Sequence, residues 1–228
     1  MQIRSALLTT CAAAALTLSL GMGSALAIPL SNVGTVGPIS SGGNTFSNIG
    51  CTITMAGGLA FPNNCNQIDA SSSGGNLNLA SGFTAGFGTF DDALITYQVT
   101  SATPITSVGL TFNGTFLGFA ISQVTETIYS DTARTNVVGQ LHVSCSLLGC
   151  DLSDPALETN DIPLNGSYTT LYITKDINVS ATRLGLATIS SIGQSFTTTV
   201  PEPASLALFG MGLLGLGLAK RRKAATAA

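Results

Sequence analysis

The clearest structural signal in this chain lies at residues 93–99, which read ALITYQV. Ala93, Ile95, Tyr97 and Val99 occupy every second position, and the residues between them are mostly polar. Successive side chains of a β-strand point to opposite faces, so these four would share one face. The segment therefore predicts a half-buried strand.

The same period of two returns along the chain on both sides of this segment. The alternating apolar sets are Val108/Leu110/Phe112, Leu117/Phe119/Ile121, Leu141/Val143/Cys145/Leu147, Leu171/Ile173 and Ile177/Val179/Ala181. Asn113-Gly114 lies between two of these sets and predicts a two-residue hairpin turn. No segment outside the termini has a sustained period of 3.6. We therefore expect an all-β domain, an antiparallel β-sandwich or jelly roll.

The first part of this domain has a weaker pattern. Residues 28–73 are rich in Gly, Ser and Asn, with the runs Ser40–Asn44 and Ser71–Gly75, which predict loops around short strands. The best strand candidate there is Cys51–Met55. At the other end, Thr197–Thr199 predicts a short polar spacer, which would keep the domain close to whatever follows it.

Composition limits the function classes. The 228 residues suit one folded domain with short terminal segments, and only 8% are charged, against roughly 25% in an ordinary soluble protein. Residues 28–203 contain eleven acidic side chains and three basic ones, a net charge of −8. Such a domain would be repelled by phosphate backbones, so nucleic acid is not an expected partner.

The N-terminus predicts export. Residues 1–27 begin with a single cation, Arg4, continue with a largely apolar stretch over residues 6–20, and end in Ala25-Leu26-Ala27. This three-part order is typical of a secretory signal peptide that signal peptidase cleaves after Ala27. The secreted domain would then span residues 28–199.

The C-terminus predicts a membrane anchor. Residues 204–219 are uncharged and dominated by Leu, Ala and Gly, and a helix of that length spans about 24 Å. This is slightly less than the roughly 30 Å hydrocarbon core of a bilayer. The basic cluster Lys220, Arg221, Arg222 and Lys223 follows at once and would stop transfer, with the tail on the cytoplasmic side. The chain would thus pass transiently through the inner membrane.

Directly before this span stands Val200-Pro201-Glu202-Pro203. The Pro-Glu-Pro signature, the short Gly/Leu-rich span and the terminal basic cluster together resemble the PEP-CTERM sorting domain, over residues 200–228. The resemblance implies that an exosortase-like enzyme reads Pro201, Glu202 and Pro203 and removes or exchanges the segment after them. It also implies the cell surface or exopolysaccharide matrix of a Gram-negative bacterium, with exopolysaccharide as a possible partner.

Four cysteines remain after signal removal, an even number for an oxidising compartment. Of the three possible connectivities, sequence proximity favours Cys51 with Cys65 and Cys145 with Cys150. The first bond would close a loop worth roughly 3 kcal/mol in the chain-entropy model.

Two metal sites compete with simpler interpretations. His142, Cys145 and Cys150 could bind zinc, but alternation puts His142 on the opposite strand face from Cys145, which favours the disulfide. A weak calcium candidate consists of the acidic residues of one loop, Asp151, Asp154, Glu158 and Asp161, whose spacing matches no EF-hand. We expect a solvated loop there, and we expect no cofactor.

The leading hypothesis is a non-enzymatic structural or adhesive protein of the cell surface or matrix. A carbohydrate-binding module is the alternative, because sandwich folds often bind sugars, although Trp is absent. A secreted hydrolase using Asp91 and Asp92 is a third possibility. Neighbouring strand residues point to opposite faces, so this pair fits such a site poorly.

Overall fold

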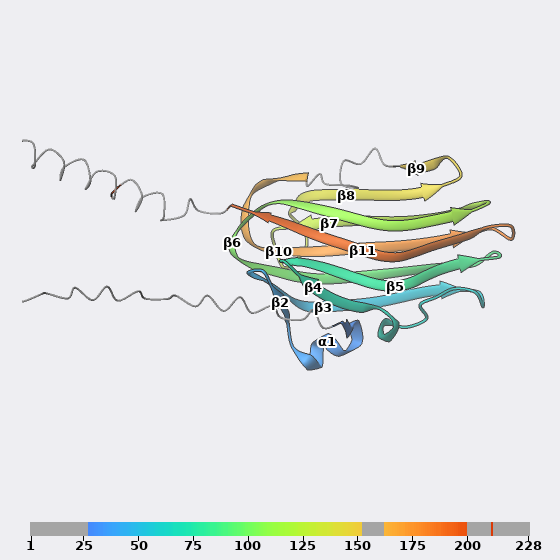
Figure 1. Cartoon of the computed structure of the whole chain (residues 1–228), viewed down its shortest axis with the longest axis horizontal. Helices are drawn as coiled ribbons and strands as arrows, with labels where there is room; N and C mark the ends of the chain where they lie inside the picture. The colour runs from blue at the N-terminus through green and yellow to red at the C-terminus, as the bar shows by residue number, and fades with distance from the viewer. Residues whose placement is uncertain (1–26, 152–161, 200–210, 212–228) are drawn as a thin grey trace, which may run out of the picture.

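The computed structural model describes residues 27–151, residues 162–199 and Met211. This part of the chain forms an antiparallel sheet of eleven strands that folds over into a two-layered sandwich (Figure 1). The elements are β1 Ile28–Pro29, α1 Leu30–Val36, β2 Ile39–Ser41, β3 Asn44–Ala56, the 3-10 turn η1 Cys65–Gln67, β4 Asp69–Ser73, β5 Asn76–Gly86, β6 Phe90–Leu117, β7 Ala120–Tyr129, β8 Val137–Ser146, β9 Gly149–Asp151, β10 Ile162–Ala181 and β11 Leu186–Thr198. The prediction of an all-β antiparallel domain is confirmed.

Two long strands, β6 and β10, run through both layers and join them. Residues 90–101 of β6 pair with β3 and β10 in the first layer, which continues through β7, β8 and β9. Residues 105–117 of β6 pair with β11 in the second layer, beside β5, β4 and β1. The change of layer occurs around Pro104, which has no N–H for a strand ladder.

The core lies between the layers and contains the predicted inward faces. Ala93, Ile95, Tyr97 and Val99 are completely buried, as the alternation at residues 93–99 predicts. Across the core, Phe46 of β3 packs on Phe196 of β11, with ring centroids 5.7 Å apart.

The core also holds polar side chains at inward-facing positions. Lys175 of β10 and Glu126 of β7 are fully buried and form an ion pair. The Nζ of Lys175 donates a second hydrogen bond to Gln194 of β11, in the other layer. Burying a charged pair costs free energy that its mutual attraction must repay.

The hairpin predicted at Asn113-Gly114 is wrong. Both residues lie inside β6, where the register with β11 shifts between the Phe112–Ile192 and Gly114–Ile189 pairs. A Cβ on Gly114 would lie 1.9 Å from the Phe112 ring, so the glycine allows the ring to cover the strand at this irregularity. The residue pair therefore marks a close approach within a strand.

The predicted shared face of Leu117, Phe119 and Ile121 is also wrong. The chain turns at Gly118, whose φ of 64° favours glycine, and strand β7 begins at Ala120. The turn resets the alternation, so the buried residues of β7 fall at even positions. Leu117 and Phe119 consequently point into solvent at 69% and 60% exposure.

Two low-pattern segments contain more strand than expected. Ser40-Ser41 and Ser71–Ser73 belong to strands, and only Gly42-Gly43 and Gly74-Gly75 form the turns. The predicted spacer at residues 197–199 is wrong for the same reason, because β11 continues through Thr198. The backbone N–H of Thr199 then donates to the carbonyl of Pro104.

Both favoured disulfides are confirmed. Cys51 of β3 is bonded to Cys65 of η1, and Cys145 of β8 is bonded to Cys150 of β9 across one hairpin. Within the described residues no helix is long and apolar enough to cross a membrane. Residues 204–219 lie outside that part, so the membrane span stays a prediction.

Candidate functional site

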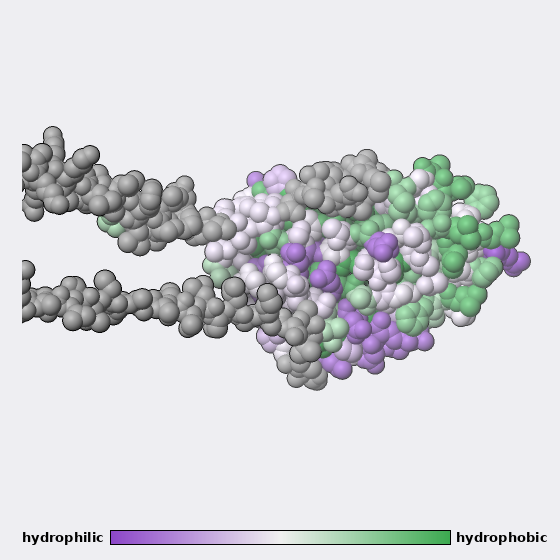
Figure 2. Space-filling view, viewed as in Figure 1, coloured by the Kyte–Doolittle hydropathy of each residue, from purple (hydrophilic) through white to green (hydrophobic). Residues whose placement is uncertain are grey.

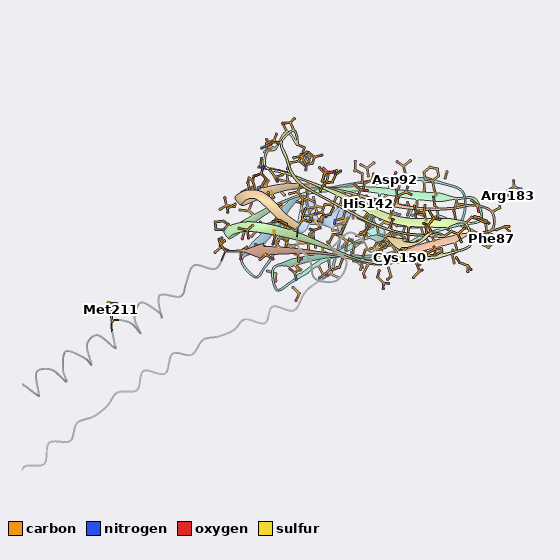
Figure 3. All side chains as sticks on the ribbon, turned by 90° about the horizontal axis from the view of Figure 1, so that it is seen from above. Phe87, Asp92, His142, Cys150, Arg183 and Met211 are labelled. Carbon is orange, nitrogen blue, oxygen red and sulfur yellow. A yellow bond between two sulfur atoms is a disulfide. The ribbon has the colours of Figure 1, made fainter. Side chains whose placement is uncertain are left out.

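A group of loops at one end of the sandwich exposes large apolar side chains. Four turns contribute, those between β5 and β6, β6 and β7, β8 and β9, and β10 and β11. We name this surface the apolar tip and define it by Phe87, Leu117, Phe119, Leu147, Leu148 and Leu184. Figure 2 shows the hydrophobic surface gathered at this end, and Figure 3 places Phe87 and Arg183 there.

Backbone hydrogen bonds between the loops fix three of the four turns together. The N–H of Phe87 donates to the carbonyl of Gly185 at 3.2 Å, and the N–H of Thr182 donates to the carbonyl of Phe119 at 2.9 Å. Phe87 itself has a positive φ of 57°, unusual for a residue with a Cβ. The loops therefore present their side chains from a supported backbone.

The side chains of the tip are mostly exposed to solvent. Their exposed fractions run from 58% for Leu147 to 99% for Leu148. Single exposed apolar residues need no explanation, but a contiguous group of this kind marks an interaction surface. Each side chain lies in a turn or next to one at this end of the sandwich.

A shallow groove runs beside these side chains. It has a volume of about 400 Å³, with apolar walls from Phe119, Ile121 and Leu147. The hydroxyl-bearing residues in its lining are Ser146, Ser180 and Thr182. The groove thus combines one aromatic ring with hydroxyl groups.

Charge is sparse around the tip. The four turns, residues 86–89, 117–119, 147–148 and 182–185, contain one ionisable side chain, Arg183. Residues 28–203 as a whole carry a net charge of −8. The tip is therefore a neutral to slightly positive area on an acidic protein.

Below the tip, Asp91 lies inside the sandwich with no exposed surface. Neither carboxyl oxygen has a side-chain partner, and burial raises its pKa to about 7, although the nearby backbone N–H of Asp92 lowers it somewhat. Asp92 points to the outer face and reaches Asp176 and Asn178 of β10. Burial and the charge of Asp176 raise the pKa of Asp92. The two neighbouring aspartates thus occupy opposite faces, as predicted.

His142 lies on the exposed outer face of β8, where its Nδ1 shares a hydrogen bond with the Thr125 hydroxyl at 3.0 Å. Cys145 is on the inner face and is committed to its disulfide. The described residues contain no cluster of His, Cys, Asp or Glu that could hold a metal ion. The structure therefore separates the zinc candidates.

The remaining predicted sites fall mostly outside the described residues. Of the calcium candidates, Asp151 belongs to β9 without a described side chain, and Asp154, Glu158 and Asp161 are not described. The same holds for Ala25 of the signal cleavage site, for the motif at residues 200–203 and for the basic cluster at residues 220–223. Ala27 is described and is exposed.

Comparison with known families gives one match. Residues 199–223 match the PEP-CTERM protein-sorting motif. The chain carries a PEP-CTERM sorting signal. The resemblance predicted from Pro201, Glu202 and Pro203 is confirmed, and the signal marks an exported protein of the cell envelope or surface.

Comparisons with curated proteins and with solved structures do not identify a relative of the sandwich domain. No curated protein matches the chain. Among solved structures, the chain is similar to TmCBM61 in complex with beta-1,4-galactotriose, with 10% identity and a TM-score of 0.33, over 66% of this chain and 90% of that one. A TM-score this low supports no inference about fold or ligand.

The sequence pattern does not predict the apolar tip. Its residues stand next to Gly or Ser at strand ends, where apolar side chains can be mistaken for the last members of a buried face. The alternation assigns Leu117, Phe119 and Leu147 to buried faces for this reason. The usable signal was the repeated pairing of one bulky apolar residue with glycine in successive turns, as in Phe87-Gly88 and Leu184-Gly185.

Proposed function

We propose that this is an exported, non-enzymatic surface protein whose sandwich carries an adhesive tip, with a lipid bilayer as the surface that the tip contacts. The observation that carries this proposal is the group of exposed apolar side chains at the end of the sandwich opposite to the start of the sorting signal at Thr199. Strand β11 starts at Leu186, beside the tip, and ends at Thr198, one residue before the sorting motif begins. Thirteen residues at about 3.3 Å each separate the two ends by roughly 40 Å.

The sorting signal supports the first part of the proposal. We expect the exosortase-like enzyme to process the chain after Pro203, once signal peptidase has cut after Ala27. The domain would begin as a membrane-tethered intermediate and end at the cell surface or in the extracellular matrix. Because β11 reaches Thr198, the domain would sit directly against its tether.

The non-enzymatic assignment draws support from the positions of the candidate groups. His142 pairs with Thr125 on the outer face, while Asp91 is enclosed between the layers. Asp92 is close enough to Asp176 for a side-chain hydrogen bond, much nearer than the roughly 5 Å or more that separates the carboxyl groups of glycosidases.

The exposure and charge of the tip favour a bilayer over a protein groove. Exposed apolar side chains enter a fluid apolar phase without needing a complementary pocket. Burying one Leu or Phe side chain contributes roughly 1.5–3 kcal/mol, so even partial insertion of six would give useful affinity. Arg183 adds attraction to anionic headgroups, whereas the acidic body of the domain would stay away from them.

Vesicle sedimentation tests the proposal. Residues 28–199 contain all the strands of the sandwich, and we expect them to sediment with vesicles of phosphatidylethanolamine and phosphatidylglycerol. The variant Leu117→Ser/Phe119→Ser/Leu148→Ser/Leu184→Ser should lose at least about tenfold in binding, since the lost burial far exceeds the 1.4 kcal/mol that corresponds to this factor.

The control is Val137→Ser, which changes a 54% exposed apolar residue at the opposite end of β8 and should bind as wild type. Absence of vesicle binding by the wild type would reject the bilayer. A dimer that the tip substitutions dissociate would identify a second copy of the chain as the occupant instead.

The groove gives a second candidate function, binding of a polysaccharide. Sugar rings pack on aromatic faces while hydroxyl groups bond to their edges, and the groove offers Phe119 with Ser146 and Thr182. A glycan array with the same domain tests this candidate. Retained signal in the Phe119→Ser variant would reject the groove as the binding site.

A further inference from the structure

Three inward-facing side chains from three strands meet in the centre of the core. Lys175 comes from β10, Glu126 from the neighbouring β7, and Gln194 from β11 in the opposite layer. All three are at least 98% buried. The group therefore combines an amine, a carboxyl group and a primary amide away from water.

The contacts bring the amine and the amide of this group together. The Nζ of Lys175 donates to Oε1 of Gln194 at 2.7 Å and is ion-paired with Oε2 of Glu126. A carbonyl bond is about 1.2 Å long, so the amide carbon Cδ lies within roughly 4 Å of the amine. The Nε2 of Gln194 donates to the backbone carbonyl of Gly109 at 2.9 Å, which fixes the amide orientation.

We propose that Lys175 and Gln194 form an intramolecular isopeptide bond, with Glu126 as the catalytic proton carrier. The bond would join β10 to β11 and thus connect the two layers of the sandwich. The bond requires no cofactor or oxidant. Its formation does not depend on what the apolar tip binds.

The reaction balances with the groups present. The carboxylate of Glu126 takes a proton from the ammonium group of Lys175, and the free amine attacks Cδ of Gln194 as the carbonyl electron pair moves to Oε1. Proton transfers through Glu126 then convert Nε2 into a leaving amine, the Cδ–Nε2 bond breaks, and Oε1 regains its double bond. Ammonia departs with one of the two protons that lysine gives up, and Glu126 keeps the other as a neutral acid.

Burial favours the first step of this sequence. It raises the pKa of Glu126 and lowers the pKa of Lys175, while their mutual attraction opposes both changes. Burial therefore reduces the free energy needed to convert the ion pair into a neutral amine and a neutral acid, relative to the same conversion in water. A neutral amine is the nucleophilic form of lysine.

Polar atoms without hydrogen-bond partners around the group also support a reactive role for it. Glu126 Oε1 and the Tyr97 hydroxyl are both buried without a hydrogen-bond partner. The pKa of Tyr97 is raised well above its usual value by burial and by the charge of Glu126. Buried polar atoms without partners are rare in native structures, and a catalytic role is one explanation for them. Forming the bond would also replace the buried ion pair of Lys175 and Glu126 with a neutral amide and a neutral acid.

The intact mass of the reduced full chain, expressed without an exosortase, tests whether the isopeptide bond has formed. We expect a mass about 17 Da below the value expected from the sequence after signal cleavage, because one ammonia is lost. Trypsin should then fail to cut after Lys175, giving residues 135–183 joined to residues 184–220. Lys175→Arg, which keeps the positive charge, should have the unmodified mass, as should Glu126→Gln.

Two results of the wild-type measurement would overturn the proposal without reference to any variant. One is a mass equal to that expected from the sequence, with separate peptides 135–175 and 184–220. The other is a loss of about 18 Da with residues 28–134 joined to residues 135–183, which would make Glu126 the partner of Lys175.

Discussion

Phe46 and Phe196 pack against each other across the two layers, with ring centroids 5.7 Å apart and a tilt of 45°. Phe46 is fully buried and also meets Tyr97 edge-on. We expect Phe46→Ala to reduce the free energy of unfolding by about 3–5 kcal/mol, as for other buried phenylalanines. Urea denaturation measures this loss. Phe119→Ala, at an exposed position, should change stability by less than about 1 kcal/mol, and an equal loss in both variants would contradict the packing.

The buried carboxyl group of Asp91 should make stability fall as pH rises. Its pKa is about 7 in the folded protein and 3.8 ordinarily, so the folded state keeps a proton that the unfolded state has lost. The contribution of Asp91 to stability is therefore largest below about pH 4, declines towards pH 7 and is level above it, by at most about 4 kcal/mol in all. Asp91→Asn should remove this part of the decline, as measured by denaturation at several pH values. An unchanged pH profile in the variant would refute the assignment.

The Cys51–Cys65 disulfide closes the larger of the two loops. Replacing both cysteines with Ser should lower the free energy of unfolding by about 3 kcal/mol in the chain-entropy model. The matched replacement of Cys145 and Cys150, which close a loop with a separation of only 5 residues, should lower it by about 2 kcal/mol. Denaturation of both variants gives the comparison, and the reverse order would count against the loop-entropy explanation.

Glu202→Ala should trap the chain in the inner membrane with its tail uncut, while cleavage after Ala27 proceeds normally. Because proline restricts the backbone of its own and the preceding residue, we expect Glu202, between Pro201 and Pro203, to be accessible. Glu202 is the charge between them that an exosortase-like enzyme can read. Membrane fractionation and intact mass in a host that carries the enzyme provide the test, with Ser205→Ala as a neighbouring control. Normal release of the Glu202 variant would show that this side chain is not recognised.

The β-class of this domain could be predicted because side-chain alternation is a local property. Residues 93–99 determine their inner face without help from distant parts of the chain. The same alternation places Lys175 between Ile173 and Ile177, and Glu126 between Val124 and Ile128, on inward positions. A charged residue at such a position is therefore visible in the sequence, although the partner that it meets is not.

Tertiary pairing explains the errors. Asn113-Gly114 favours a hairpin locally, yet β11 pairs with Phe112 and with Gly114 on either side of a register shift and keeps the segment extended. The meeting of Lys175 with Gln194 depends on how one layer folds over the other, which no local pattern specifies. The apolar tip likewise depends on four distant turns reaching the same end of the sandwich.

Strand β11 has hydrogen-bonded neighbours on both sides, β5 and β6, and it runs from the apolar tip to the sorting signal. If the tip is held and the C-terminus is pulled, the force acts along the axis of this one strand. Its ladder bonds are perpendicular to that axis, so they are loaded together in shear and do not open one after another. Tension between the tip and the C-terminus at a cell surface would therefore act along the direction in which the sandwich resists force best.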